Sequence, residues 1–434
     1  MKRYLYIIIG IIAVAIVAIA AIISIKKGGS SAFLGLGGSL PSAGTQTAGN
    51  GAAPSSNGAS SSSGTASGTM ALGQGAPAQT FGIVSDGPIL DYFVNASNTI
   101  TAIEPDGEVI SIANGSTTIV SSTTIPNIIS ASFSYDGKKV LVSSGDPMDP
   151  HTDIFSVPSA SWTSGPTGMI SPQWSPERTY SIAYLVTQSS GLTTLAIRNA
   201  ANLAQAPITE TSLMATGVTL QWPSKNIFIL SDKPTNNDTG SIWAFNAATG
   251  KFSPIAYELS GAETTWGLIN NSTIGVLFND TGITSQALQL VSPTGASIHS
   301  LSFITLPSKC AFAANTTTIP ASPTAQTTTA GAATTSTSAS AAATMVTTSS
   351  PYLYCGVPQD QTSFTKAALP DAYNMMSLFT ADELLRVNLT TGGFQVLRSD
   401  ATPHVDATDL KVANNILFFV NRYDQKLYAL TLPQ

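Results

Sequence analysis

Aromatic residues recur at a nearly constant interval through the middle of this chain. Phe133, Trp174, Trp222 and Trp266 are 41, 48 and 44 residues apart, and each is followed by an apolar stretch with the length of a strand. A period of 40–50 residues with several strands per unit is typical of β-propeller blades. The spacing therefore predicts an all-β domain of repeated sheets, which we expect to cover residues 78–434.

A second marker, an apolar strand followed by a turn with glycine, falls later in each unit. Ile242–Asn246 leads to Gly250, and Leu384–Asn388 leads to Gly392. Glycine supplies the positive φ that tight hairpin turns require. Because this marker recurs in phase with the aromatic one, we expect each unit to contain antiparallel hairpins.

The turn Phe133–Lys138, which reads Phe-Ser-Tyr-Asp-Gly-Lys, and the strand Asp153–Val157 resemble the TolB/WD40-like β-propeller repeats of bacterial envelope proteins. The resemblance covers about residues 80–434 apart from one insertion, and the turns after Trp222 and Trp266 depart from it. It implies a propeller fold. It does not identify a ligand, because propellers carry many unrelated activities.

We predict seven blades, and six or eight are the alternatives. Their approximate bounds are 81–121, 122–165, 166–213, 214–259, 260–305, 306–399 and 400–434. The last segment is too short for four strands. We therefore expect Ala78–Val84 to complete it, so that the two ends of the chain pair and leave no exposed sheet edge.

The first 27 residues have the pattern of a membrane anchor. Tyr4–Ile25 is a run of 22 apolar or small residues without charge, and about 20 such residues in a helix cross a bilayer. A cleaved signal peptide is the alternative, but apolar residues follow Ala18 and Ala20, where a polar mature start is expected. Gly, Ser, Ala and Thr dominate residues 28–77, a composition typical of a disordered linker.

A second low-complexity run, rich in Thr, Ala and Ser, occupies residues 315–350 inside the sixth predicted blade. Without it, the strands that carry Cys310 and Cys355 become neighbours, and the two side chains face each other across the pair. We predict a disulfide between them, with two buried free thiols as the alternative. A disulfide and an anchor together indicate that the propeller lies outside the cytoplasm.

The sequence contains few signals of catalysis. The sequence has no nucleophile elbow, Walker A loop or HExxH helix, and its three histidines are far apart. We expect no cofactor and place binding ahead of catalysis. A loop with Asp146, Asp149 and Asp153 contains carboxylates that could bind Ca²⁺. Its spacing is not that of an EF-hand, and a solvated turn is the alternative interpretation.

Aromatic residues outside the repeat are candidates for a binding face. Tyr92, Trp162 and Tyr373 do not recur at one blade position. The recurring aromatic residues, in contrast, are expected to pack between blades.

Beyond the four cations beside the anchor, the chain has 14 Lys and Arg against 24 Asp and Glu. This acidic balance disfavours nucleic acid and anionic lipid surfaces as partners. We expect a single-pass membrane protein, anchored through residues 4–25, whose propeller binds or organises a protein or polymer of the cell envelope. The alternative is an envelope enzyme that acts on glycan or peptide at the propeller axis.

Overall fold

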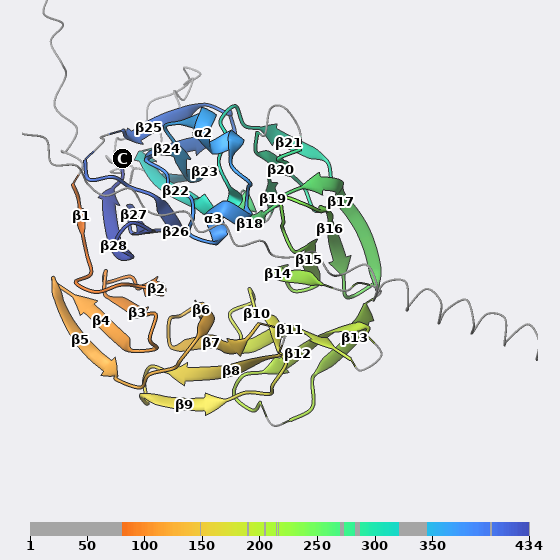
Figure 1. The fold of residues 1–434 in the computed structure, drawn as a ribbon. Coiled ribbons are helices and arrows are strands. Elements are labelled where there is room, and N and C mark those ends of the chain that lie inside the picture. Colours follow the sequence, from red (N-terminus) through yellow and green to blue (C-terminus); the bar gives the residue numbers. More distant parts are fainter. Residues whose placement is uncertain are drawn as a thin grey trace, which may run out of the picture. The chain divides into compact units, whose positions relative to one another are not determined.

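The computed structural model describes residues 80–147, 149–188, 191–203, 205–213, 215, 217–269, 273–282, 287–320, 345–399 and 402–433. They form seven four-stranded antiparallel sheets around one axis (Figure 1). The prediction of an all-β, seven-bladed propeller is therefore confirmed. The chain divides into two units, Met1–Ala71 and Leu72–Gln434, and the propeller belongs to the second.

The predicted anchor at residues 1–27 and the predicted linker at residues 28–77 lie outside the described residues. In the part of the chain that the structure describes, no helix has both the length and the hydropathy to cross a membrane. The anchor and the linker stay predictions.

The first three blades follow one another along the chain. Blade one contains β2 (Asp91–Val94), β3 (Ile100–Ile103), β4 (Val109–Ala113) and β5 (Ser116–Ser121). Blade two contains β6 (Ile128–Phe133), β7 (Lys139–Asp146), β8 (Asp149–Ser156) and β9 (Ser161–Ser164). Blade three contains β10 (Ile170–Trp174), β11 (Ser181–Thr187), β12 (Thr193–Asn199) and β13 (Thr209–Leu213).

The next three blades have the same order. Blade four contains β14 (Val218–Ser224), β15 (Ile227–Asp232), β16 (Thr239–Asn246) and β17 (Lys251–Ser260). Blade five contains β18 (Thr264–Ile269), β19 (Thr273–Phe278), β20 (Gln289–Val291) and β21 (Ser297–Ser300). Blade six contains β22 (Cys310–Pro320), β23 (Met345–Pro358), β24 (Asp382–Asn388) and β25 (Phe394–Arg398).

Blade seven joins the two ends of the propeller. It contains β26 (Ala407–Ala413), β27 (Ile416–Asn421) and β28 (Lys426–Thr431), and its fourth strand is β1 (Phe81–Ile83). Phe81 pairs with Leu430, and its ring centroid lies 5.6 Å from that of Tyr428. The predicted closure of the ring by its N-terminal strand is confirmed.

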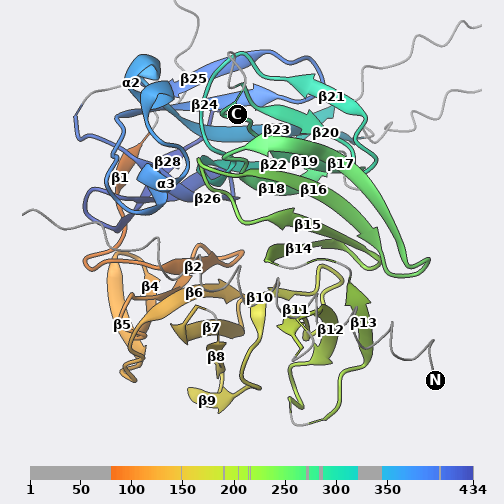
Figure 2. The same cartoon turned by 45° about the vertical axis from the view of Figure 1, so that its right-hand side comes forward.

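The first strand of each blade lies nearest the axis, where first strands of neighbouring blades contact one another (Figure 1 and Figure 2). Bulges or irregularities interrupt the pairing of β6, β10, β14 and β26 with their second strands. A bulge bends a strand and re-aims its side chains. These irregular positions therefore shape the polar surface near the axis.

A separate hydrophobic cluster fills each of the seven interfaces between neighbouring blades. Trp222 packs with Leu185 and Phe228 between blades three and four, and the Trp174 indole donates a 3.0 Å hydrogen bond to the Ser132 carbonyl of the preceding blade. Burying one such side chain contributes about 1.5–3 kcal/mol. The expectation that recurring aromatic residues pack between blades is confirmed at these positions.

Blade six differs from the prediction at its insertion. The β22–β23 ladder continues past the pair Asn315–Ser350 as far as the pair Pro320–Met345, so both ends of the predicted insertion at 315–350 belong to the hairpin. Threonine is β-branched and suits an extended strand, so a Thr-rich run lengthens the hairpin. Residues 321–344 lie outside the described residues.

The predicted disulfide is present. Cys310 and Cys355 are direct partners in the β22–β23 ladder, with their Cα atoms 4.2 Å apart, and their sulfurs are bonded. Both side chains are buried in the cluster between blades five and six. The bond therefore fixes the base of the hairpin that carries the insertion.

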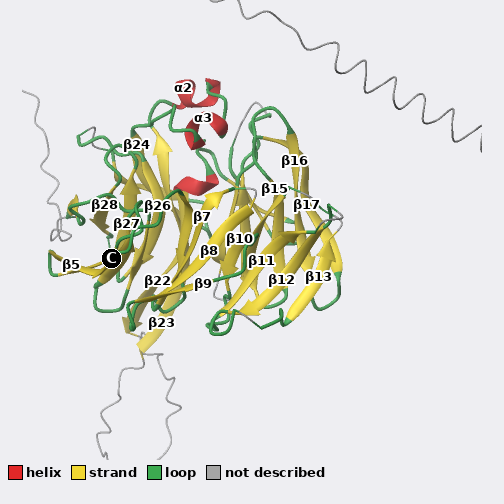
Figure 3. Cartoon of the chain, turned by 60° about the horizontal axis from the view of Figure 1, so that its bottom comes forward, coloured by secondary structure: helices red, strands yellow, loops and turns green. Residues whose placement is uncertain are grey.

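Short helices that the sequence did not predict occupy one end of the propeller (Figure 3). They are α2 (Gln361–Lys366), α3 (Asp371–Asn374) and the 3₁₀ helix η1 (Pro307–Lys309). We call residues 359–381, which connect β23 to β24, the helical cap. Its small core contains Phe364, Leu369 and Tyr373 packed on Leu306.

Candidate functional site

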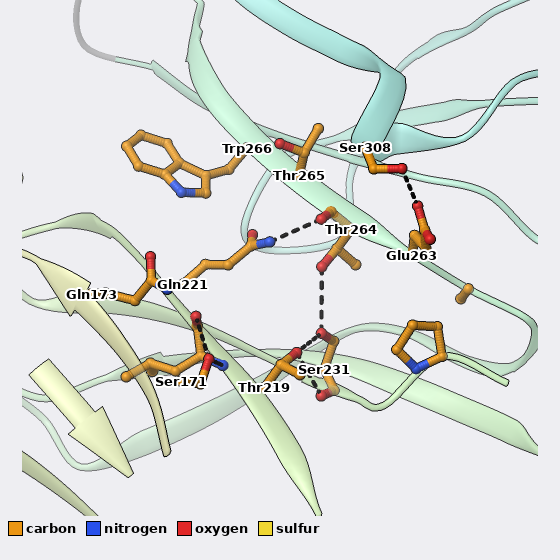
Figure 4. Close-up of a pocket in the computed structure, with 13 residues that line it drawn as sticks. Ser171, Gln173, Thr219, Gln221, Ser231, Glu263, Thr264, Thr265, Trp266 and Ser308 are labelled. Atoms are coloured by element: carbon orange, nitrogen blue, oxygen red, sulfur yellow. Dashed lines mark hydrogen bonds between the residues drawn. The ribbon is translucent and has the colours of Figure 1, made fainter. Parts of the chain in front are cut away.

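A cavity of about 480 Å³, here called the polar cavity, lies among the first strands of blades three, four and five (Figure 4). Eight of its 13 lining residues carry a neutral hydroxyl or amide. They are Ser171, Gln173, Thr219, Gln221, Ser231, Thr264, Thr265 and Ser308. The size falls within the usual range for small-ligand sites.

Ser171 enters this cavity from a bulge in β10. Its backbone has a φ of +50°, a left-handed conformation that is uncommon for a residue other than glycine. Its hydroxyl donates to the Leu220 carbonyl at 3.2 Å and accepts from the Leu220 amide at 3.0 Å. These two contacts join blade three to blade four and keep the strained residue in place.

Further hydroxyl and amide groups line the cavity beside Ser171. The hydroxyl oxygens of Thr219 and Ser231 are 2.7 Å apart, and those of Ser231 and Thr264 are 3.3 Å apart. The side-chain amide of Gln221 donates to the Thr264 carbonyl at 2.8 Å. Figure 4 shows Gln221 reaching across from blade four to blade five. The wall is thus held in one arrangement before any ligand arrives.

Glu263 supplies the carboxyl group among the lining residues. It is buried, with 8% of its surface exposed, and burial raises its pKa above the ordinary value. Its two carboxylate oxygens accept hydrogen bonds from Ser308 Oγ at 2.7 Å and Asn374 Nδ2 at 3.2 Å. Trp266, half-buried on β18, adds an aromatic surface to the lining.

A buried group of charges, the Lys309 cluster, lies next to this wall. It comprises Lys309, Asp382, Asp406 and Arg422. Lys309 Nζ is 2.7 Å from Asp382 Oδ2 and 2.5 Å from Asp406 Oδ1, and Arg422 Nη1 is 2.8 Å from Asp406 Oδ2. Two cations and two carboxylates make the cluster neutral.

Each charge in this cluster depends on its partners. Burial raises the pKa of Asp382 to about 6, against the opposing effect of Lys309. Burial also acts to lower the pKa of Lys309, but Asp382, Tyr373 and Asp406 outweigh it and hold that pKa above its ordinary value. The four groups come from η1, the start of β24, the residue before β26 and the residue after β27. Lys309 Nζ also donates to Thr380 Oγ1 of the helical cap at 2.9 Å, so the cluster ties the cap to blades six and seven.

A second cavity, of about 390 Å³, lies between the helical cap and blades one and seven. We call it the apolar cavity, because Ile89, Leu90, Val420 and Met376 contribute much of its lining. Ser308 lines both cavities. The neighbouring Lys309 is fixed by the ion pairs just described, so the position of Ser308 is also fixed.

The structure buries two of the three aromatic residues predicted to form a binding face. Tyr92 is 1% exposed, and its hydroxyl donates to the Asp409 carbonyl at 2.7 Å. Tyr373 is 3% exposed, and its hydroxyl donates to Asp406 at 3.0 Å. Trp162 is half-buried on β9, the outermost strand of blade two, against Phe155. These three residues do not form one face, because the non-recurring rings pack into blades and the cap.

The three predicted metal-binding carboxylates lie on the β7–β8 hairpin. Asp146 and Asp149 are exposed partners at its tip. Asp153 lies further along β8 and accepts a 2.8 Å hydrogen bond from Ser164. Within the described ranges, no three His, Cys, Asp or Glu side chains converge closely enough to hold a metal ion.

Sequence reasoning missed the polar cavity and the Lys309 cluster. Lys309 is 97 residues from Asp406, and isolated charged residues in a sequence are usually solvated. Trp266 was predicted as a packing residue because it shares the spacing of the buried tryptophans. The signal that could have identified it is its departure from the repeat, since Gly267 and Leu268 replace the usual turn residues.

No protein-family model and no curated protein matches this chain. Solved structures resemble its fold at low identity. A prolyl endopeptidase matches at 12% identity and a TM-score of 0.45, covering 81% of this chain and 51% of that chain. The propeller domain of the Trilobed protease from Pyrococcus furiosus matches at 9% identity and a TM-score of 0.44, covering 79% of this chain and 94% of that chain. BamB from Moraxella catarrhalis matches at 12% identity and a TM-score of 0.41, covering 81% of this chain and 85% of that chain. This chain spans about half the length of the first of these.

Proposed function

We propose that this chain is an extracytoplasmic binding module, held to the membrane by residues 4–25, that binds a neutral glycan polymer of the cell envelope in the polar cavity. The observation that carries the proposal is the lining of that cavity. Hydroxyl and amide side chains, most of them from three first strands, line it together with a half-buried tryptophan, Trp266, and one carboxyl, Glu263.

This lining suits a sugar better than a charged or apolar ligand. Sugar hydroxyls both donate and accept hydrogen bonds, and Gln221 Oε1, which is buried without a hydrogen-bond partner among the described residues, can accept from such a hydroxyl, while the Gln173 amide can donate to and accept from one. The C–H face of a sugar ring packs on an aromatic surface such as Trp266. A few placed polar groups in a preformed cavity are the usual basis of ligand specificity.

The predicted linker fits capture of a polymer near the membrane. A Gly/Ser-rich segment of about 50 residues spans roughly 40 Å, so the propeller would search the volume next to the bilayer while it stays attached. Attachment raises the effective concentration of the binding site for a polymer within that reach.

The residues of the polar cavity favour binding over hydrolysis. Glycoside hydrolysis ordinarily uses two carboxyl groups that flank the scissile bond. Glu263 is the one carboxyl residue among those lining the cavity, and it is already engaged by Ser308 and Asn374. We therefore assign Glu263 to holding the wall of the cavity.

The test is photo-crosslinking of the full chain in its native envelope. A photoreactive residue at Thr265, in the polar cavity, is compared with one at Thr117, on the exposed outer strand of blade one. The expected result is glycan fragments attached at position 265 and absent at position 117. A protein attached at 265, or equal labelling at both positions, would contradict the glycan assignment.

Location needs its own measurement. Protease added outside intact cells should digest the propeller, whereas a propeller that is protected until the membrane is opened would overturn the extracytoplasmic assignment.

A further inference from the structure

Four large apolar side chains in or next to the helical cap are exposed. Met375, Met376, Phe379 and Tyr423 are 71%, 42%, 39% and 48% exposed. Phe379 and Tyr423 stack with their ring centroids 5.4 Å apart, and Met376 lines the apolar cavity. We call these four residues the methionine–aromatic patch. Exposed apolar side chains beside a cavity are typical of an interaction site.

Arg422 holds this patch in place. Its guanidinium centre lies 3.6 Å from the Tyr373 ring centroid and 5.0 Å from that of Phe379. Its Nη2 donates to the Tyr373 carbonyl at 2.5 Å and to Met376 Sδ at 3.0 Å. Because Asp406 neutralises its charge, Arg422 orders the patch without making it basic.

Acidic groups border the same cavity. Asp409 lines it with its side chain 30% exposed, and it shares Lys411 with Asp91. Burial raises the pKa of Asp409 to about 8, so its carboxyl is mostly protonated near neutral pH and this group adds no net charge.

Pro105, another lining residue, lies between Glu104 and Asp106. Burial raises the pKa of Glu104, and Glu108 and Asp106 raise it further, which means that the three carboxylates repel one another. In the described part of the chain, none of the three forms an ion pair with Lys or Arg.

We propose that the apolar cavity and the methionine–aromatic patch together form a docking site for a peptide segment with a large apolar side chain flanked by Lys or Arg. The apolar side chain enters the cavity between Ile89, Leu90 and Met376. The flanking cations lie against Glu104 and Asp106, the carboxylates on either side of Pro105. This site differs from the polar cavity and does not depend on the glycan proposal.

Charge decides among the possible occupants. An anionic lipid surface would be repelled by the carboxylates at the rim, and a purely apolar ligand would leave their mutual repulsion unrelieved. Exposed Met and aromatic residues adapt to varied apolar side chains, while the carboxylates select a cationic neighbour. A cationic, apolar peptide satisfies both parts of the site.

The test uses a fluorescently labelled short peptide with a central Phe-Leu pair and Lys on both sides. Its anisotropy is measured with the full chain in neutral detergent. One comparison peptide has Glu in place of Lys, and another has Ser in place of Phe-Leu. The proposal predicts binding of the first peptide alone, weakened by added salt because the rim contacts are screened. Absence of binding, or equal binding of the Glu peptide, would overturn it.

Variants of this chain test where the peptide binds. Met376 has a φ of +57°, so Met376→Asn removes the apolar contact with a residue that tolerates this conformation. The double variant Glu104→Gln, Asp106→Asn removes rim charge without touching the core. Each should weaken peptide binding about tenfold, or about 1.4 kcal/mol. Glu210→Gln, an exposed carboxylate of blade three, should leave binding unchanged. Equal affinity in all variants would contradict the assigned site.

Discussion

Ser308 Oγ donates a 2.7 Å hydrogen bond to Glu263 Oε2, and Ser308 lines the polar and the apolar cavity. The two cavities therefore share a wall made by η1, the short helix that precedes blade six. Next to Ser308, Lys309 connects this helix to Asp382 and Asp406. The buried charges thus support the wall on which the two proposed sites depend.

Replacing Lys309 with Met should destabilise the propeller strongly. The variant leaves Asp382 buried without its cation, and breaking a buried ion pair in this way costs about 3–5 kcal/mol. Urea unfolding of the variant and of Lys251→Met, an exposed lysine on β17, measures the difference. A loss no greater than that of the control would mean that the cluster does not hold the fold together.

Asp409→Asn should make stability less dependent on pH. Burial raises the pKa of Asp409 to about 8, whereas the unfolded chain has an ordinary aspartate pKa of about 3.9. The folded state therefore binds the proton more tightly, and the free energy of unfolding falls as pH rises between these values. Asn does not titrate, so the variant should lose less stability from pH 5 to pH 8.

The size of this effect is reduced by solvent, because the Asp409 side chain is 30% exposed. Urea unfolding at both pH values, with exposed Asp238→Asn as the control, gives the comparison. Parallel pH profiles for wild type and Asp409→Asn would contradict the assigned titration.

Phe81→Ala should weaken closure of the ring. Phe81 packs on Phe419 and Tyr428, and the Arg398 guanidinium lies 4.2 Å from its ring centroid. The side chain is half-buried, so we expect the free energy of unfolding to fall by about 2 kcal/mol. This is less than the 3–5 kcal/mol lost when a fully buried phenylalanine is replaced by alanine. Phe394→Ala, on the exposed outer strand of blade six, is the matched control in thermal unfolding. Equal shifts of the unfolding temperature in both variants would show that the packing of Phe81 does not stabilise closure of the ring.

Reducing the disulfide should lower the free energy of unfolding by about 4 kcal/mol, the value that the chain-entropy model gives for a loop of 45 residues. The bond constrains the unfolded chain around the long insertion. Denaturant unfolding with and without dithiothreitol measures this loss, and the variant Cys310→Ala, Cys355→Ala should show no response to the reductant. A wild-type protein equally stable in both conditions would contradict a stabilising role.

The fold could be predicted because its signals are local and repeated. Gly250 and Gly392 have φ values of +66° and +74°, as their hairpin turns require. Cys310 and Cys355 could be paired because removing the insertion places their strands in register. Each of these inferences needed only a short segment and the period that repeats it.

The candidate sites could not be predicted because they are assembled from single residues of different blades. Tyr373 and Tyr92 looked like surface aromatics outside the repeat, yet their hydroxyls reach Asp406 and the Asp409 carbonyl in blade seven. Nothing in a local window indicates such a partner. The start of the Thr-rich run after Asn315 belongs to a strand for another reason. Its low complexity is typical of a loop, but threonine also favours extended strands.

The most direct test of the central claim is calorimetric titration of the full chain with soluble glycan strands prepared from the envelope. Trp266→Ala removes the aromatic surface of the polar cavity, and Trp162→Ala, on the outermost strand of blade two, is its matched control. We predict saturable binding to wild type and to Trp162→Ala, and about tenfold weaker binding to Trp266→Ala. No binding to wild type, or equal binding to both variants, would contradict the account.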